Sequence, residues 1–490
     1  MRNARSWLAG VAVFALVATG CDSENPPDAQ KVADVTASRS AEMVRGVSAS
    51  VRTMNGLPAV DSLEEALSVF NTGFAGVPLP VLPPSEEVEE EEDGSSLPDF
   101  SSEAETDAQA ARLEKYLRER VFTAEHVEST EGDSTVFLLK GENVCTDGSQ
   151  AADTDCVKFV NQSELRVRAT TLDDDGLELA FLIGSKRAQP MSLRFLPKDI
   201  SLVVDLGGVK SAVQQLDAEA AAALPTVMVG QVELKVTKRG EQHWIVSGSI
   251  LQALRLELTD EDGTLAISSA RAAPLVELEA DGAAKRARFL LDLNTTEVRL
   301  PYSGFAPALR GKDWTVSLSG LSFTLEATEG QKDFTVGHVG LGDAQSFLSL
   351  GADKLFTLDL NSQSGRHFDL NLSRGDDGLP LVRVQPEVDL VARFFLAPLK
   401  ADSEMEVPSA YEEATYRVRF TGGTGGPSLR PVRANATTGF KGGIQVVTGE
   451  LSLTAGASSV SVSAGQCLVG RETSSGGGSL LDYLQSGGCQ

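Results

Sequence analysis

The sequence is poor in the residues and motifs that carry most enzyme chemistry. It has 4 histidines among 490 residues. None lies four positions from another, the spacing that places two metal ligands on one helical face. The sequence also contains no GxSxG, HExxH or P-loop motif. We therefore predict that the protein is not an enzyme, has no catalytic residue and binds no cofactor. The histidines are expected on the surface, at His126, His243, His338 and His367.

Positive charge is also scarce. The chain has 43 Lys and Arg against 69 Asp and Glu, a formal net charge of −26. Nucleic-acid binding needs a basic face, so we predict no nucleic-acid partner. The same deficit excludes docking on anionic lipid by charge alone. Aromatic residues make up 6% of the chain, which weighs against a sugar-binding face built on stacked rings.

Long apolar runs are missing beyond the N-terminus, so we predict no membrane span. At the N-terminus, Arg2 and Arg5 precede the apolar stretch Trp7–Val17. This stretch is too short to cross a bilayer and is typical of a secretory signal peptide. We place the signal peptide at residues 1–20.

The end of that segment, Ala18-Thr19-Gly20-Cys21, resembles the lipobox of bacterial lipoproteins. The resemblance covers residues 1–21 and implies cleavage before Cys21 and acylation of that cysteine. The chain would then be anchored to a membrane of the cell envelope, on the periplasmic side or at the cell surface. The sequence leaves open whether that is the inner or the outer membrane. The alternative is an ordinary signal peptide with an incidental Cys21.

The cysteines support an extracytoplasmic location. With Cys21 set aside, Cys145, Cys156, Cys467 and Cys489 remain, an even number in two local groups. Three connectivities are possible, and local pairing within each group is the simplest. No pair has the CxxC spacing of a redox or zinc motif.

Composition divides the chain into segments. The clearest linker is 77–99, where four prolines precede the acidic run Glu86–Asp93. The predicted organisation is a signal peptide at 1–20, a tether with short helices at 21–76, the linker at 77–99, a helix within 100–134, a main antiparallel β region at 135–421, and a C-terminal β segment with a disulfide-closed tail at 428–490.

Alternation of apolar and polar residues favours an all-β body of antiparallel hairpins. At the hairpin 275–293, one register places Val276 opposite Phe289 and, on the other face, Glu277 opposite Arg288. We predict hairpin-rich sheets, either a sandwich or a curved open sheet, preceded by a helical N-terminal section. One helix is expected inside the β region, at 209–224.

One group of polar residues is a candidate metal site. A hairpin around residues 362–366 would place Asp359 opposite Asp369, with Asn361 and Asn371 nearby. Opposed like charges are unfavourable, and a divalent cation would compensate them. A neighbouring Lys or Arg, or exposure to water, would do so equally well. We predict no metal site and name these four residues as the candidates.

Three functions remain open. The first is a membrane-anchored lipoprotein that acts as a non-enzymatic binding or scaffolding component of the envelope, with an envelope protein as partner. The second is a carrier of lipid or another hydrophobic ligand, marked by an open apolar cavity instead of a sealed core. The third is an envelope hydrolase without a recognisable motif, marked by acids of perturbed pKa beside His243, His338 or His367.

Overall fold

The described part of the chain forms two compact units. The structure, a computed structural model, describes residues 27–57, 59–60, 103–131, 133–145, 154–173, 176–259, 264–269, 273–293, 296–302, 309–318, 322–329, 333–340, 346–360, 367–374, 379–385, 387–402, 407, 412–470 and 480–489. The predictions for 1–20, Cys21 and 77–99 lie outside these residues. Unit 1 comprises Met1–Leu57, Glu91–Arg255 and Ala272–Ala283, and unit 2 comprises Pro58–Glu90, Leu256–Arg271 and Ala284–Gln490.

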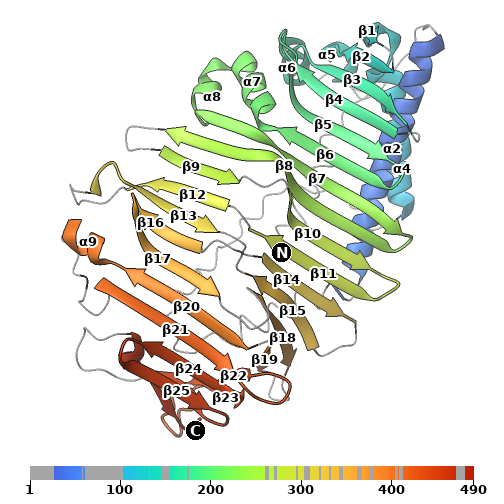
Figure 1. Cartoon of the computed structure of the whole chain (residues 1–490). Coiled ribbons are helices and arrows are strands. Elements are labelled where there is room, and N and C mark those ends of the chain that lie inside the picture. Colours follow the sequence, from blue (N-terminus) through green and yellow to red (C-terminus); the bar gives the residue numbers. More distant parts are fainter. Residues whose placement is uncertain are drawn as a thin grey trace. The chain divides into compact units, whose positions relative to one another are not determined.

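The described residues are mostly β, in large open antiparallel sheets with an N-terminal helix, so the predicted fold class is confirmed. Unit 1 contains an antiparallel meander in which β1 to β7 pair in chain order, and β8 pairs with β10 (Figure 1). The strands are β1 (Val127–Glu131), β2 (Ser134–Leu138), β3 (Arg166–Leu172), β4 (Gly176–Ile183), β5 (Ala188–Leu196), β6 (Asp199–Asp205), β7 (Val227–Gly240), β8 (His243–Thr259) and β10 (Ala273–Asp281). The first strand thus begins at Val127, eight residues before the start predicted for the β region, residue 135.

Unit 1 also contains helices, of which α2 contacts β3 to β7 and α7 contacts β5 to β7. They are α2 (Pro27–Gly56), α4 (Glu103–Tyr116), the π-helical turn η1 (Leu117–Val121), the 3-10 turn η2 (Ala124–His126), α5 (Gly141–Val144), α6 (Thr154–Ser163), α7 (Leu206–Leu216) and α8 (Ala218–Ala222). A single long helix, α2, therefore occupies much of the region for which short helices are predicted. The helix expected at 209–224 is divided at Asp217, whose Oδ1 accepts hydrogen bonds from the backbone N of Glu219 and Ala220 at 2.9 and 3.0 Å.

Small side chains let α2 approach the sheet closely. The helix contacts α4 and strands β3 to β7. Its buried residues include Ala33, Thr36, Ala37, Ser40, Ala41 and Ser48. A Cβ added at Gly46 would lie 2.7 Å from Cδ1 of Ile200 in β6. The backbone of α2 therefore lies close to the Ile200 side chain, and a large residue at position 46 would have to displace it.

We expect Gly46→Leu to lower the free energy of unfolding of unit 1 by about 1–3 kcal/mol, because overpacking forces side chains and backbone apart. Chemical denaturation followed by circular dichroism measures the change. Gly56→Ala is the matched control, since nothing lies within 4 Å of a Cβ there. A Gly46→Leu protein as stable as the wild type would show that the helix does not touch the sheet at this point.

Both predicted disulfides are formed. Cys145 pairs with Cys156, and Cys467 pairs with Cys489, at sequence separations of 11 and 22. The first bond joins the segment of α5 to α6 and belongs to the core of unit 1. Disulfides of this kind persist in oxidising compartments, so the two bonds indicate an extracytoplasmic protein.

Unit 2 is built from two series of hydrogen-bonded strands, which we call ladder A and ladder B (Figure 1). Ladder A pairs, in order, β9 (Thr264–Ser269), β12 (Thr296–Pro301), β13 (Asp313–Leu318), β16 (Ser346–Leu350), β17 (Asp353–Leu360), β20 (Val388–Phe395), β21 (Glu413–Thr421), β24 (Glu450–Ala455) and β25 (Ser458–Ser463). Two short helical segments, α9 (Ala397–Asp402) and η4 (Leu480–Tyr483), also belong to this unit.

Ladder B is assembled in the same way. It pairs, in order, β11 (Arg286–Asp292), β14 (Ser322–Thr328), β15 (Asp333–Gly340), β18 (His367–Arg374), β19 (Pro380–Gln385), β22 (Ser428–Val432), β23 (Gly443–Thr448), β26 (Cys467–Gly470) and β27 (Leu484–Gly487). Successive hairpins alternate between the ladders: β12–β13 joins A, β14–β15 joins B, and β16–β17 joins A. The chain therefore changes ladder after each hairpin.

Candidate binding face on ladder A

The predicted metal candidates are not brought together. Asp359 lies in β17 of ladder A opposite Val391, whereas Asp369 and Asn371 lie in β18 of ladder B. The predicted opposition of Asp359 and Asp369 is therefore wrong. The reason is that the chain changes ladder between β17 and β18. Strand β17 pairs with β16 and β20 of ladder A, whereas β18 pairs with β15 and β19 of ladder B. Asn361 lies outside the described residues.

One histidine is buried, contrary to the expectation that all four lie on the surface. His126 is 1% exposed. Its Nδ1 lies 2.7 Å from the carbonyl oxygen of Val121, and its Nε2 lies 3.2 Å from Nδ2 of Asn143. This geometry fits a neutral ring that donates from Nδ1 and accepts at Nε2. Burial lowers the pKa of His126, although the hydrogen bond to Val121 opposes that shift.

This burial predicts an acid-sensitive unit 1. The unfolded histidine has a pKa near 6.5, and the folded one titrates at lower pH. Below about pH 6.5 the unfolded state therefore binds more protons, and the free energy of unfolding falls as the pH falls. His126→Gln should make this fall shallower between about pH 7 and pH 5, as measured by chemical denaturation at each pH. Measurement near pH 8, where both states hold a neutral ring, reports the structural cost of the substitution separately. An unchanged slope would contradict the prediction.

His243 takes part in a cross-strand contact of unit 1. Its Nε2 lies 2.9 Å from Oε1 of Glu279, and its Nδ1 lies 3.8 Å from Oδ2 of Asp281. The register of β8 and β10 places Asp281 directly opposite His243. Opposite charges so placed stabilise antiparallel pairing when the ring is protonated. The other two histidines lie in unit 2, His338 in β15 and His367 in β18.

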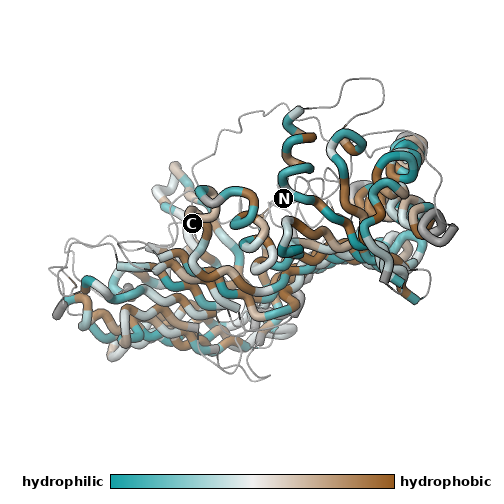
Figure 2. Tube along the Cα trace, turned by 90° about the horizontal axis from the view of Figure 1, so that it is seen from above, coloured by the Kyte–Doolittle hydropathy of each residue, from teal (hydrophilic) through white to brown (hydrophobic). Residues whose placement is uncertain are grey.

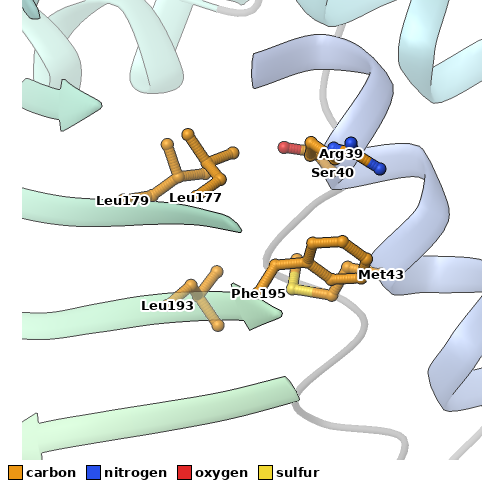
Figure 3. A pocket seen from close by; sticks show the side chains of 7 residues that line it. All are labelled: Arg39, Ser40, Met43, Leu177, Leu179, Leu193 and Phe195. Carbon is orange, nitrogen blue, oxygen red and sulfur yellow. The ribbon is translucent and has the colours of Figure 1, made fainter. Parts of the chain in front are cut away.

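A small cavity lies between α2 and strands β4 and β5 (Figure 3). Its volume is about 10 Å³, room for about one water molecule. Its lining is formed by Arg39, Ser40, Met43, Leu177, Leu179, Leu193 and Phe195. The guanidinium of Arg39 lies 6.0 Å from the centre of the Phe195 ring. The cavity is a small gap where α2 packs on the sheet. Neither His243 nor any of the metal candidates lines it.

Ladder A of unit 2 has one apolar face. Along the strands, hydrophobic residues alternate with hydrophilic ones (Figure 2), and the registers align the hydrophobic ones into rows. One row begins with Ile267 opposite Val298, continues through Val316 and Leu348, and reaches Phe356. We define the apolar face of ladder A by Ile267, Val298, Val316, Leu348, Phe356, Leu358, Leu390, Phe394, Val418, Phe420, Leu451, Leu453, Val460 and Val462.

Burial of this face changes along the ladder. At the β9 end, Ile267 is 37% exposed. Residues in the middle, such as Val316 in β13 and Leu390 in β20, are half-buried. At the other end Phe420 is 3% exposed and Val462 is 0% exposed. Covering of the face is therefore uneven. Leu350, on the same side of β16 as Leu348, is 2% exposed, whereas Leu453 in β24 and Val460 in β25 are half-buried.

The last part of the chain packs against the β24 and β25 end of ladder A. Segment η4 contacts β24 and β25, and β25 also contacts β23 and β27 of ladder B. The bond between Cys467 and Cys489 ties the end of the described chain to β26. At this end Leu451, Val462, Leu481 and Leu484 are buried, whereas Leu453 and Val460 are half-buried.

The opposite, polar face of ladder A carries paired charges. Arg417 Nε donates to Oδ1 of Asp389 at 2.6 Å, and Arg419 lies 3.4 Å from the same carboxylate. The hydrogen bond from Arg417 lowers the pKa of Asp389. In β12, Arg299 pairs with Glu297 at 2.9 Å. A slip of one residue would turn these charges onto the apolar face, so the two faces together specify the register.

The alternation of apolar and polar residues along single strands is visible in the sequence, but the apolar face of ladder A is not. The signal was present in each strand, because Val298, Val316 and Leu390 all lie at alternating positions. What was missing was the strand order, since hairpins distant in the sequence become neighbours in ladder A. Rows that cross several hairpins therefore could not be assembled from the sequence.

No family model, curated protein or solved structure matches this chain. Among the helices in the described ranges, none is both long and apolar enough to cross a membrane.

Proposed function

We propose that the chain is a lipid-anchored, non-enzymatic binding protein of the bacterial cell envelope, where it holds or scaffolds another envelope component. The binding surface is the apolar face of ladder A. The observation that carries the proposal is that a row of apolar residues, from Val298 in β12 to Phe394 in β20, crosses five strands and is half-buried at each of them. A contiguous apolar surface left open to water is typical of an interaction site.

Two features support the location. The residues Ala18–Cys21 follow an apolar stretch in the manner of a lipoprotein signal. The disulfides Cys145–Cys156 and Cys467–Cys489 fit a compartment that keeps thiols oxidised. An acylated Cys21 would anchor the chain to a membrane.

The anchor is tested by metabolic labelling with an alkyne derivative of palmitate. We expect the wild-type chain to incorporate the label and to fractionate with membranes, and we expect Cys21→Ser to lose both properties because it has no acylation site. The double variant Cys145→Ser, Cys156→Ser is the control and should keep the label. Label on the Cys21→Ser chain, or none on the wild type, would contradict the proposed anchor.

The binding face is tested by photo-crosslinking in cells. A benzophenone amino acid replaces either Val316, on the apolar face, or its neighbour Thr315, on the polar face opposite Arg299 and Ser349. We expect position 316 to yield at least five times more covalent adduct than position 315, because a bound partner covers only the apolar side. Equal yields at the two positions would overturn the assignment of the face.

A further inference from the structure

The start of helix α2 limits how far unit 1 can lie from a lipid anchor on Cys21. The helix begins at Pro27, so only the five residues from Asp22 to Pro26 separate it from that cysteine. An extended chain spans at most about 3.6 Å per residue, so the first residue of α2 lies within about 22 Å of Cys21. Acylation of Cys21 would therefore bring this end of unit 1 to the membrane surface.

Helix α6 lies at the same end of unit 1 as the start of α2. Asp34 of α2 pairs with Arg118 of η1 at 3.1 Å. Segment η1 contacts α5, and α5 contacts α6. Ala33 of α2 and Val160 of α6 belong to one hydrophobic core cluster. Figure 1 shows α5, α6 and one end of α2 together at the top of the view.

One side of α6 faces solvent and carries an aromatic ring. Four exposed positions share this side because they are three or four residues apart: Asp155, Lys158, Phe159 and Gln162. Phe159 is 54% exposed, the largest exposed fraction among the large hydrophobic side chains of the described residues. Val160, on another side of the helix, is buried and packs in the core. The ring of Phe159 therefore projects from a polar helix surface.

The neighbours of Phe159 favour a lipid surface as its partner. A stable protein interface buries at least about 1,000 Å² and has an apolar centre, whereas the other exposed residues on this side of α6 are polar. An aromatic ring beside a lysine suits the membrane interface, where the ring enters the acyl boundary and the ammonium stays among the headgroups. Phe159 and Lys158 provide this pair.

The anchor and the rigidity of α6 together make one ring sufficient. A single side chain binds a membrane weakly, but an anchored chain meets the membrane at a high effective concentration. Helix α6 is fixed to α5 by the bond Cys145–Cys156. Asn161 adds two hydrogen bonds, accepting from the backbone N of Gly141 at 2.8 Å and donating to Glu142 at 2.9 Å. Little ordering is therefore needed when the ring meets lipid.

We propose that unit 1 docks on the membrane that holds Cys21, with α6 against the lipid headgroups and the ring of Phe159 inserted into the interface. This inference rests on the proposed function, from which it takes the acyl anchor. It adds a second contact with the membrane, which sets the orientation of unit 1.

The test measures contact with lipid at two positions of the full acylated chain, whose acyl groups are verified by mass spectrometry. A genetically encoded dansyl amino acid replaces either Phe159 or Ala104, an exposed residue of α4. Ala104 is the matched control because the neighbouring Thr106 contacts Arg52, which lies about 38 Å along α2 from Pro27. The chain is reconstituted into phosphatidylcholine vesicles that contain nitroxide-labelled phosphatidylcholine, since a net charge of −26 disfavours anionic lipid.

We expect nitroxide to quench the dansyl emission at least threefold more strongly at position 159 than at position 104, because only the side chain at 159 reaches lipid. Adding Cys21→Ser to the position 159 chain should abolish the quenching, since the ring alone binds weakly. Circular dichroism establishes that the variants fold. The exposure of Phe159 means that its replacement leaves the core intact.

The outcomes separate the two proposals. Equal quenching at the two positions, or none at 159, in a chain with verified acyl groups overturns the docking of α6 and leaves the proposed anchor in place. Undiminished quenching in the Cys21→Ser chain shows that the dansyl group enters lipid by itself, which also overturns the docking. A purified wild-type chain that carries no acyl group contradicts both proposals.

Discussion

Apolar side chains that meet across neighbouring antiparallel strands are the interaction on which the whole structure depends. In unit 1 they pair strand after strand in chain order, as Val167 does with Phe181. In unit 2 the same pairing joins strands of different hairpins, as Leu390 does with Val418. Each pair contributes about 0.2–1 kcal/mol, so the long series of pairs stabilises the sheets where no single residue does.

The two units differ in what covers those pairs. In unit 1 the helix α2 lies on the sheet, and its small residues and Gly46 allow the close approach that buries the core. In unit 2 the short segment η4 contacts β24 and β25 of ladder A. The half-burial of the apolar residues from β12 to β20 is the physical basis of the proposed binding face.

Some features could be predicted because they depend on local pattern. The antiparallel, hairpin-rich fold class follows from the alternation of apolar and polar residues along the chain. The disulfides follow from proximity along the chain. The opposition of Asp359 and Asp369 failed because the same alternation fits a hairpin and a change of ladder equally well. The burial of His126 also escaped, because its partner Asn143 comes from a different element.

The sequence by itself determined that this is a β-rich, disulfide-bonded chain with an N-terminus that resembles a lipoprotein signal. These properties reside in periodicity, composition and short motifs. Only the tertiary structure decided which hairpins are neighbours and which apolar residues are covered, so that Ile267 is exposed whereas Val462 is buried. The reason is that alternation specifies which side of a strand is apolar, whereas strand order and covering depend on contacts between residues far apart in the chain.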